Sequence, residues 1–211
     1  GNLDTVTTDE ILTLFAQRIT DATLADRVSP RGVLLYGDGT FASDPTWAII
    51  STATGTIDNF AVIPSEQPGI RVLVSAFSRG DYLFVLNRYQ TSGDATIQAL
   101  LQVFRITADK GTTLLGEEIV PKAFQLGLYV DRRYLWVFGS NGGYLGMIRK
   151  SWAKIGTSPD AATTTGWQYW GQSRWSDKPE ILGTLESTDG PILAQGPCSM
   201  ARYRDTYYLV T

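Results

Sequence analysis

A short unit recurs three times along the chain, and no other feature of the sequence constrains the fold as strongly. Each copy is a tight polar turn that follows an apolar run and precedes an aromatic-rich run, the pattern of a β-hairpin. The copies span residues 78–85, 130–137 and 202–210. Tyr82 and Tyr134 lie 52 residues apart, and Tyr134 and Tyr207 lie 73 residues apart. Spacings of about 40–50 residues, lengthened by loop insertions, are typical of the four-stranded blades of a β-propeller.

Short β-branched and aromatic runs, separated by glycine and other turn residues, fill the chain from residue 31 onward. They predict about a dozen strands and an all-β fold. The clearest runs cover residues 32–36, 47–52, 71–76, 82–88, 97–106, 125–130, 134–139, 144–149, 199–203 and 207–210. A β-sandwich would contain similar hairpins, but the spacing of the recurring unit favours a propeller.

The number of expected strands is too small for a closed wheel, because a five-bladed propeller needs about twenty. We therefore expect a propeller of the five-bladed type that is incomplete in residues 31–211. An unpaired strand edge invites pairing. Either the native chain continues beyond residue 211, or neighbouring chains complete the sheet.

Residues 8–26 carry the one convincing helical pattern, with Ile11 and Phe15 on a helical stripe after a Thr-Thr-Asp-Glu start. We expect residues 1–30 to be a helical segment and residues 31–211 to be the propeller domain. The helix and the open sheet edge are the two places through which copies of the chain could form a homo-oligomer.

The sequence has no histidine and a single cysteine, Cys198. These counts exclude a His/Cys zinc site, an internal disulfide and an imidazole-dependent catalytic triad, and we expect neither a metal nor a cofactor. Carboxylates, tyrosines and lysines remain for proton transfer, and carboxylate pairs are the catalytic groups of glycoside hydrolases. A net charge of −3 with scattered basic residues argues against nucleic acid as a partner. The sequence lacks an apolar run long enough to predict a membrane span.

Several motifs from about residue 31 onward occur in an order that resembles the DUF4185 family. They are residues 35–41 (LYGDGTF), 134–139 (YLWVFG), 147–150 (MIRK), 166–171 (GWQYWG), 197–203 (PCSMARY) and 207–209 (YYL). That family comprises secreted actinobacterial and bacteroidal proteins with a five-bladed β-propeller, linked to endo-D-arabinanase activity in glycoside hydrolase family 183. The resemblance implies a secreted propeller that cleaves an arabinan-type cell-wall polysaccharide.

Asp38 and Glu66 are the expected catalytic carboxylates. The inner strands of a propeller converge on an axial funnel, where acidic residues from different blades can meet at the separation that sugar hydrolysis requires. Asp38 stands at a strand-to-turn junction in the motif of residues 35–41, although an Asp before a Gly also forms ordinary Asx turns. Glu66 precedes the expected strand of residues 71–76, although its position in a Pro- and Gly-containing loop favours a solvated loop glutamate.

Trp170, Trp175 and Arg202 are the expected sugar-binding residues, because the two tryptophans are flanked by polar residues and Arg202 could hold a sugar hydroxyl or carboxylate. Core packing of the tryptophans and an ion pair of Arg202 between blades are the alternatives. Strand alternation places Trp167 and Tyr169 on one face and Trp170 on the other.

Four further acidic residues are expected to have no catalytic role. Asp131 and Asp205 occupy the recurring turns and are interpreted as turn formers. Glu117 and Glu118 are expected to face solvent on opposite sides of a strand.

Two functions follow from these patterns. The first is a glycoside hydrolase that acts on arabinan-type polysaccharide through the carboxylate pair. The second is a non-catalytic carbohydrate- or receptor-binding module, such as a phage tail component. Both predict a cell-wall glycan as the partner and an extracellular or virion-surface location.

Overall fold

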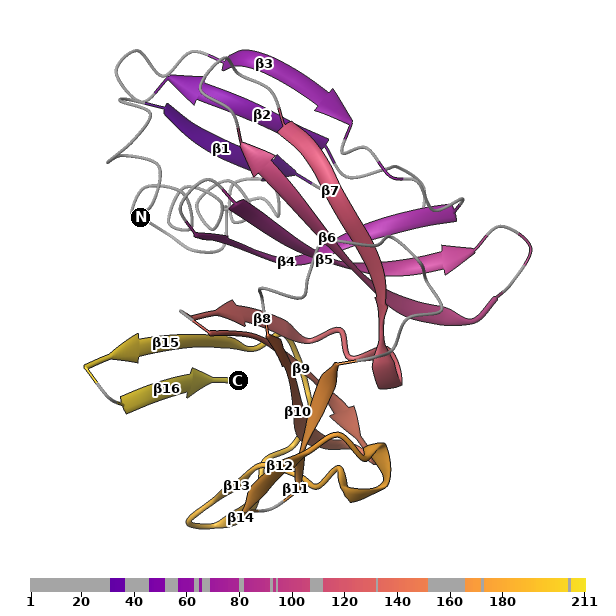
Figure 1. Ribbon diagram of the computed structural model, residues 1–211, viewed down its shortest axis with the longest axis vertical. Coiled ribbons are helices and arrows are strands. Elements are labelled where there is room, and N and C mark those ends of the chain that lie inside the picture. Colours follow the sequence, from indigo (N-terminus) through magenta and orange to yellow (C-terminus); the bar gives the residue numbers. More distant parts are fainter. Residues whose placement is uncertain are drawn as a thin grey trace, which may run out of the picture.

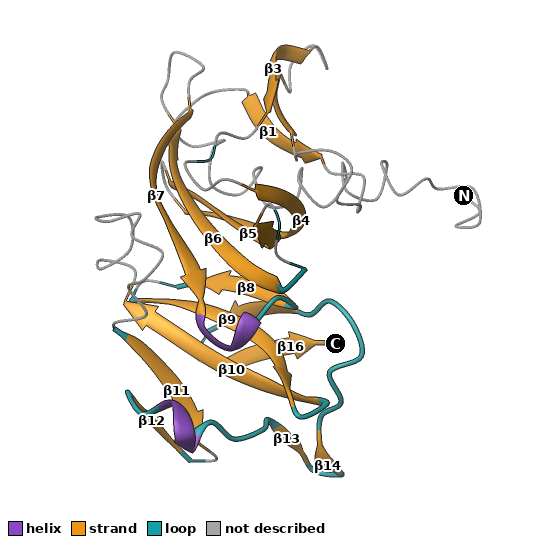
Figure 2. Cartoon of the chain, turned by 90° about the vertical axis from the view of Figure 1, so that its right-hand side faces the viewer, coloured by secondary structure: helices purple, strands orange, loops and turns teal. Residues whose placement is uncertain are grey.

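The computed structural model describes the chain in segments. They are residues 31–36, 46–51, 57–62, 65, 69–79, 82–91, 93, 95–106, 112–131, 133–151, 166–171, 173–204 and 206–211, with the backbone alone in the first three segments. The expected N-terminal helix of residues 8–26 lies outside the described residues. Within them, the only helical elements are the short 3-10 turns η2 (Pro121–Ala123) and η4 (Pro179–Ile181), visible in Figure 2. No helix in this described part is long and apolar enough to cross a membrane.

Two antiparallel sheets form the body of the protein, which confirms the all-β prediction. The four-stranded sheet consists of β4 (Gly69–Arg79), β5 (Tyr82–Thr91), β6 (Ile97–Ile106) and β7 (Thr112–Val120). The five-stranded sheet consists of β8 (Gly127–Val130), β9 (Tyr134–Asn141), β10 (Tyr144–Ser151), β11 (Trp167–Gly171) and β12 (Arg174–Ser176). In both sheets each strand pairs with its neighbour in the sequence.

Three smaller sheets accompany them. The N-terminal sheet consists of β1 (Arg31–Tyr36), β2 (Thr46–Ser51) and β3 (Ile57–Val62). The hairpins are β13 (Glu186–Ser187) with β14 (Gly190–Pro191), and β15 (Ser199–Tyr203) with β16 (Thr206–Val210). The four-stranded sheet lies between the N-terminal sheet and the five-stranded sheet (Figure 1).

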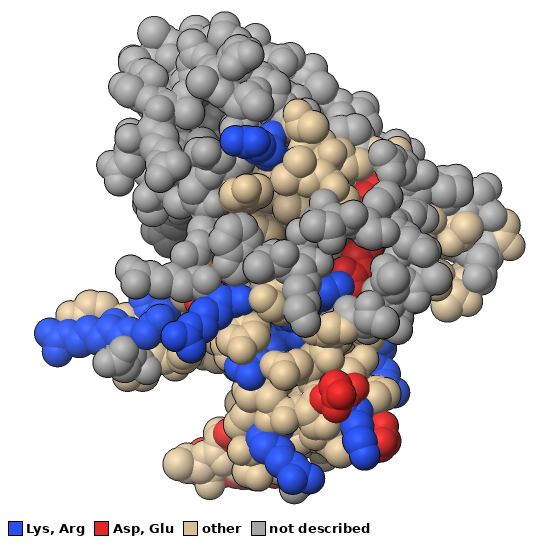
Figure 3. All heavy atoms as spheres, viewed as in Figure 1, with Lys and Arg blue, Asp and Glu red and all other residues tan. Residues whose placement is uncertain are grey.

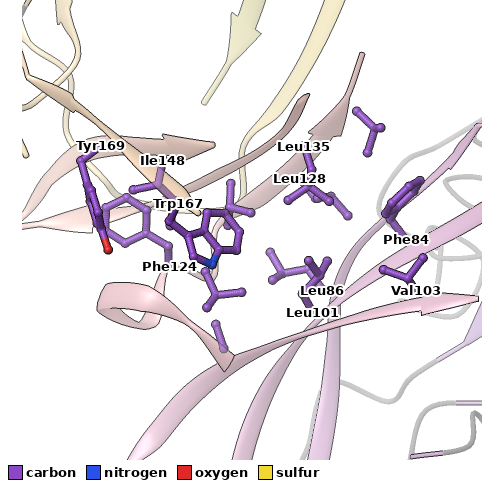
Figure 4. Packing of buried hydrophobic residues seen from close by; sticks show 14 residues of the cluster. Phe84, Leu86, Leu101, Val103, Phe124, Leu128, Leu135, Ile148, Trp167 and Tyr169 are labelled. Carbon is purple, nitrogen blue, oxygen red and sulfur yellow. The ribbon is translucent and has the colours of Figure 1, made fainter. Parts of the chain in front are cut away.

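The main hydrophobic core lies between the four-stranded and five-stranded sheets (Figure 4). Successive side chains of a strand point to opposite faces, so β5 sends Phe84 and Leu86 to this core while Leu83 and Val85 are buried on its other face. Residues that face them across the core include Leu135, Val137, Ile148 and Trp167. The four-stranded sheet is thus covered on both of its faces.

Coverage of both faces overturns the expectation that Glu117 and Glu118 face solvent, because their side chains are 2% and 6% exposed. Glu118 accepts hydrogen bonds from Lys150 Nζ at 2.5 and 2.7 Å and from Trp167 Nε1 at 2.6 Å. A buried carboxylate is tolerated when it is paired and hydrogen-bonded in this way. On the other face, Gln102 Nε2 donates to Glu117 at 2.5 Å.

The recurring units are hairpins, as the sequence predicted. The residue pairs that close their turns are Arg79 with Tyr82, Asp131 with Tyr134, and Tyr203 with Thr206. Each unit supplies the first two strands of its sheet. Tyr82 and Tyr134 therefore correspond to Thr206, and Tyr207 is one position further along its strand.

The first strands of successive sheets also lie next to one another. Strand β4 contacts β8, and β8 contacts β15. Just before β8 and β15, the backbone N–H of Cys198 donates to the carbonyl oxygen of Leu126 at 2.8 Å. This arrangement brings the C-terminal hairpin, β15–β16, against the five-stranded sheet although β13 and β14 intervene in the sequence.

Candidate functional site

A pocket of about 440 Å³ opens between the five-stranded sheet and the C-terminal hairpin. Its lining, from here called the aromatic pocket, consists of Asp131, Arg133, Tyr134, Trp136, Arg149, Arg202 and Tyr207. The turn between β8 and β9 supplies the first two residues, and β9, β10 and the C-terminal hairpin supply the others. Because Leu135 and Val137 of β9 point into the main core, Tyr134 and Trp136 point to the opposite face.

Asp131 lies at the centre of the hydrogen bonding in the aromatic pocket. Its Oδ1 accepts the backbone N–H groups of Arg133 and Tyr134 at 2.6 and 2.8 Å in an Asx turn, so Asp131 forms the turn as the sequence predicted. Its Oδ2 accepts Trp136 Nε1 at 3.2 Å and the phenol of Tyr207 at 3.0 Å. Burial alone raises the pKa of Asp131, but these four hydrogen bonds outweigh that effect and hold the pKa below its ordinary value. The carboxylate is therefore ionised at neutral pH.

Arg149 is held among aromatic rings. Its guanidinium carbon lies 4.0 Å from the ring centroid of Tyr134 and 4.1 Å from that of Trp175, distances typical of cation–π contacts. Its Nε donates to Gln168 Oε1 at 2.9 Å. Burial lowers the pKa of Arg149, whereas Tyr134, Asp131 and Tyr207 act to raise it. An arginine remains charged at neutral pH under such shifts, so the aromatic pocket contains a fixed, oriented cation.

The aromatic rings form a connected group around this cation. Trp136 contacts Trp175 with ring centroids 5.2 Å apart and Tyr207 with centroids 5.8 Å apart. Trp175 in turn contacts Trp170 at 5.2 Å, the two residues being direct partners on β11 and β12. Large rings fixed at such distances present flat apolar surfaces whose orientation is set before a ligand arrives.

One of the predicted sugar-binding residues, Arg202, lines the aromatic pocket, and a second, Trp175, contacts residues of its lining. Arg202 lines it, with Nε donating to the carbonyl oxygen of Arg204 at 2.9 Å and the guanidinium 5.4 Å from the ring of Tyr207. Trp175 lies against the lining residues Arg149 and Trp136. Trp170 packs behind Trp175.

Trp167 and Tyr169 point to the main core, as strand alternation predicted. The predicted catalytic residues Asp38 and Glu66 lie outside the described residues, so their relation to the aromatic pocket stays a prediction.

The charge of the described lining residues is positive. Three arginines and one aspartate give a net charge of +2 (3 − 1), in a chain whose net charge is −3. Figure 3 shows basic side chains gathered over the C-terminal hairpin and beside it. Among the residues that the structure describes, no three acidic or cysteine side chains gather in a way that could hold a metal ion. The described lining is therefore suited to a ligand that has flat faces able to stack on aromatic rings and groups that accept hydrogen bonds.

No family model, curated protein or solved structure matches this chain. The chemistry of the aromatic pocket is therefore argued from its own geometry.

Sequence reasoning missed six residues of the aromatic pocket: Asp131, Arg133, Tyr134, Trp136, Arg149 and Tyr207. The alternation of Tyr134 and Trp136 with two aliphatic residues was visible and indicates a strand with one aromatic face. Asp131 was interpreted as a turn former. This interpretation accounts for Oδ1, which accepts backbone N–H groups of the turn, but not for Oδ2, which accepts a side-chain hydrogen bond from Trp136. Nothing local marks Arg149, because its aromatic neighbours come from two other strands.

Proposed function

We propose that the protein binds carbohydrate in the aromatic pocket. The observation that carries the proposal is a group of fixed rings, from Tyr134, Trp136 and Tyr207, beside charged hydrogen-bonding groups in a hollow of about 440 Å³. Sugar rings have apolar C–H faces that stack on aromatic rings and hydroxyl edges that need donors and acceptors. The volume is within the range of small-ligand sites, about 300–1,000 Å³.

We further propose that the sheets are blades of a β-propeller. Each large sheet is a meander of strands in sequence order, and the first strand of the five-stranded sheet, β8, lies between the first strands β4 and β15 of two other sheets. The innermost strands of propeller blades have this relationship around the central channel. In such a propeller the aromatic pocket would lie between the blade formed by the five-stranded sheet and the blade that contains β15 and β16, at the end of the blades where the turns of the recurring hairpins lie.

A glycoside hydrolase that acts on arabinan-type polysaccharide is the second candidate function. The motif of residues 35–41 and the resemblance that includes it favour this candidate, with Asp38 and Glu66 as the carboxylate pair. In that case the aromatic pocket would hold part of the polysaccharide away from the cleavage point. Both candidates imply contact with an extracellular glycan.

Binding to an array of immobilised bacterial polysaccharides tests the first proposal. Tyr207→Ala should weaken binding to the preferred glycan about tenfold, equivalent to ~1.4 kcal/mol. Tyr208→Ala is the matched control, because the neighbouring side chain on β16 points to the opposite face and is also exposed. Circular dichroism of both variants checks that the fold is retained. Absence of binding by the unmodified chain, or equal loss in the two variants, would contradict the proposal.

A further inference from the structure

The described lining of the aromatic pocket has more basic than acidic side chains. Arg133, Arg149 and Arg202 contribute three positive charges, and Asp131 contributes the one negative charge among the described lining residues. All four hydrogen bonds described for the Asp131 carboxylate come from neutral donors: two backbone N–H groups, an indole and a phenol. The aspartate therefore organises the turn and β16, and the lining keeps its net charge of +2.

Arginine is also the cation best suited to planar oxyanions, because its guanidinium presents five N–H donors in a fixed plane. In Arg149 one of these donors, Nε, binds Gln168, and the rings of Tyr134 and Trp175 lie against the group. These contacts fix the orientation of the guanidinium before a ligand arrives. Arg202 is fixed in a similar way by the carbonyl oxygen of Arg204.

We infer that the aromatic pocket selects acidic glycans, whose carboxylate or phosphate group pairs with the arginines while a sugar ring stacks on the aromatic side chains. This inference rests on the proposed function. It narrows the ligand class to polysaccharides that carry acid groups, which neutral arabinan lacks. Charge-assisted hydrogen bonds of this kind are shorter and stronger than neutral ones, so the acid group supplies both affinity and orientation.

The test compares polysaccharides that differ only in charge. Uronic-acid polymers are paired with their carboxyl-reduced forms, which keep the linkages and lose the acid, and a polyol-phosphate wall polymer is measured beside them. Poly-L-glutamate serves as a polyanion without sugar rings. Binding to the acidic polymers should be at least about tenfold tighter than to the reduced forms, and it should weaken as salt is added. The uronate and phosphate arms distinguish the two sources of negative charge.

A pair of double variants assigns the effect to the aromatic pocket. Arg133→Gln with Arg202→Gln removes two positive charges from the lining and should abolish the preference for the acidic form. Arg88→Gln with Arg105→Gln removes the same two charges from exposed positions on β5 and β6 and should leave the preference unchanged.

The outcomes separate the two proposals. Equal binding to the acidic and reduced polymers would overturn the acidic preference and leave carbohydrate binding intact. Binding to no glycan would overturn both. Binding to poly-L-glutamate as tight as to the acidic polymers, or equal effects of the two double variants, would show that charge alone attracts the polymer and would overturn the inference.

Discussion

The phenol of Tyr207 donates a 3.0 Å hydrogen bond to the carboxylate of Asp131, 76 residues earlier in the chain. Asp131 holds the turn between β8 and β9, and Tyr207 lies on β16, so the bond links one hairpin to the next. The ring of Tyr207 also packs edge-on against Tyr129, which packs edge-on against Phe77 of β4. This chain of contacts connects the hairpins β4–β5, β8–β9 and β15–β16.

Loss of the Tyr207 phenol should loosen the C-terminal hairpin. Tyr207→Phe keeps the ring and removes one hydrogen bond, so docking should weaken by about 1 kcal/mol. Hydrogen exchange of the β15 and β16 amides measures this opening, and the exchange rates should rise about fivefold. Tyr208→Phe is the control, since its side chain lies on the opposite face of β16. Equal exchange in the two variants would mean that the bond to Asp131 does not hold the hairpin.

The thiol of Cys198 should report the same opening chemically. Burial raises the pKa of this thiol to about 12, which keeps it protonated and unreactive near neutral pH. We expect slow labelling by a thiol reagent at pH 8 and complete labelling in denaturant. Labelling should be faster in Tyr207→Phe than in the unmodified chain. Rapid labelling of the native protein would contradict the buried position beside β8.

The stability that Asp131 contributes should depend on acid pH. The folded-state pKa is lower than the unfolded one, which is about 4. The contribution is therefore fully present above pH 4 and is lost as the pH falls through the folded-state value. Thermal midpoints of Asp131→Asn and the unmodified chain should differ at pH 7 and converge toward pH 2. A difference that stays constant over this range would show that the charge of Asp131 is not responsible.

Breaking the ion pair between Glu118 and Lys150 should cost much more than breaking a surface pair. Both side chains are buried between the two large sheets, so Lys150→Met leaves a carboxylate without its cation and should destabilise the protein by about 3–5 kcal/mol. Glu118→Gln together with Lys150→Met removes both charges and keeps an acceptor for Trp167 Nε1, so most of the loss should be recovered. Urea unfolding measures both variants. A cost below about 1 kcal/mol for Lys150→Met, the value of an exposed pair, would contradict this account.

The hydrolase candidate predicts that substitution of Asp38 lowers activity. If Asp38 is a catalytic carboxylate, Asp38→Asn should reduce the release of reducing sugar from actinobacterial arabinan about 10²–10⁴-fold. Asp189→Asn is the control, because Asp189 is exposed in the turn between β13 and β14. Full activity in Asp38→Asn would remove Asp38 from the catalytic site and favour the binding function alone.

Local patterns in the sequence predicted the strands and hairpins because strand pairing here joins neighbours in the chain. The recurring turns carry their own signal, as the Asx turn of Asp131 shows. The alignment of the third unit could not be fixed in the same way, because matching the tyrosines aligns Tyr207 with Tyr82 and Tyr134, whereas the pairing of Tyr203 with Thr206 shows that Thr206 is the equivalent residue. One position along a strand reverses the face of every side chain, which is how Tyr207 comes to face Asp131.

Burial and the site were less predictable because they depend on contacts between distant segments. Glu118 looks like a surface residue until Lys150 and Trp167 from another sheet are placed against it. Arg149 likewise becomes part of a site only through Tyr134 and Trp175. Trp175 was predicted from its polar neighbours in the sequence and Arg202 from the chemistry of its side chain. The structure places Arg202 in the lining of the aromatic pocket and Trp175 against the lining residues Arg149 and Trp136.

The order of strands in the sheets has a consequence for biosynthesis. In the two large sheets every strand after the first pairs with the strand made just before it, so a nascent chain can add each strand to the sheet as it leaves the ribosome. Pairing of this kind closes short loops and avoids the slow search for distant partners. The bonds of Glu118 and Asp131 join different sheets, so each can form only after both of its partners have been made.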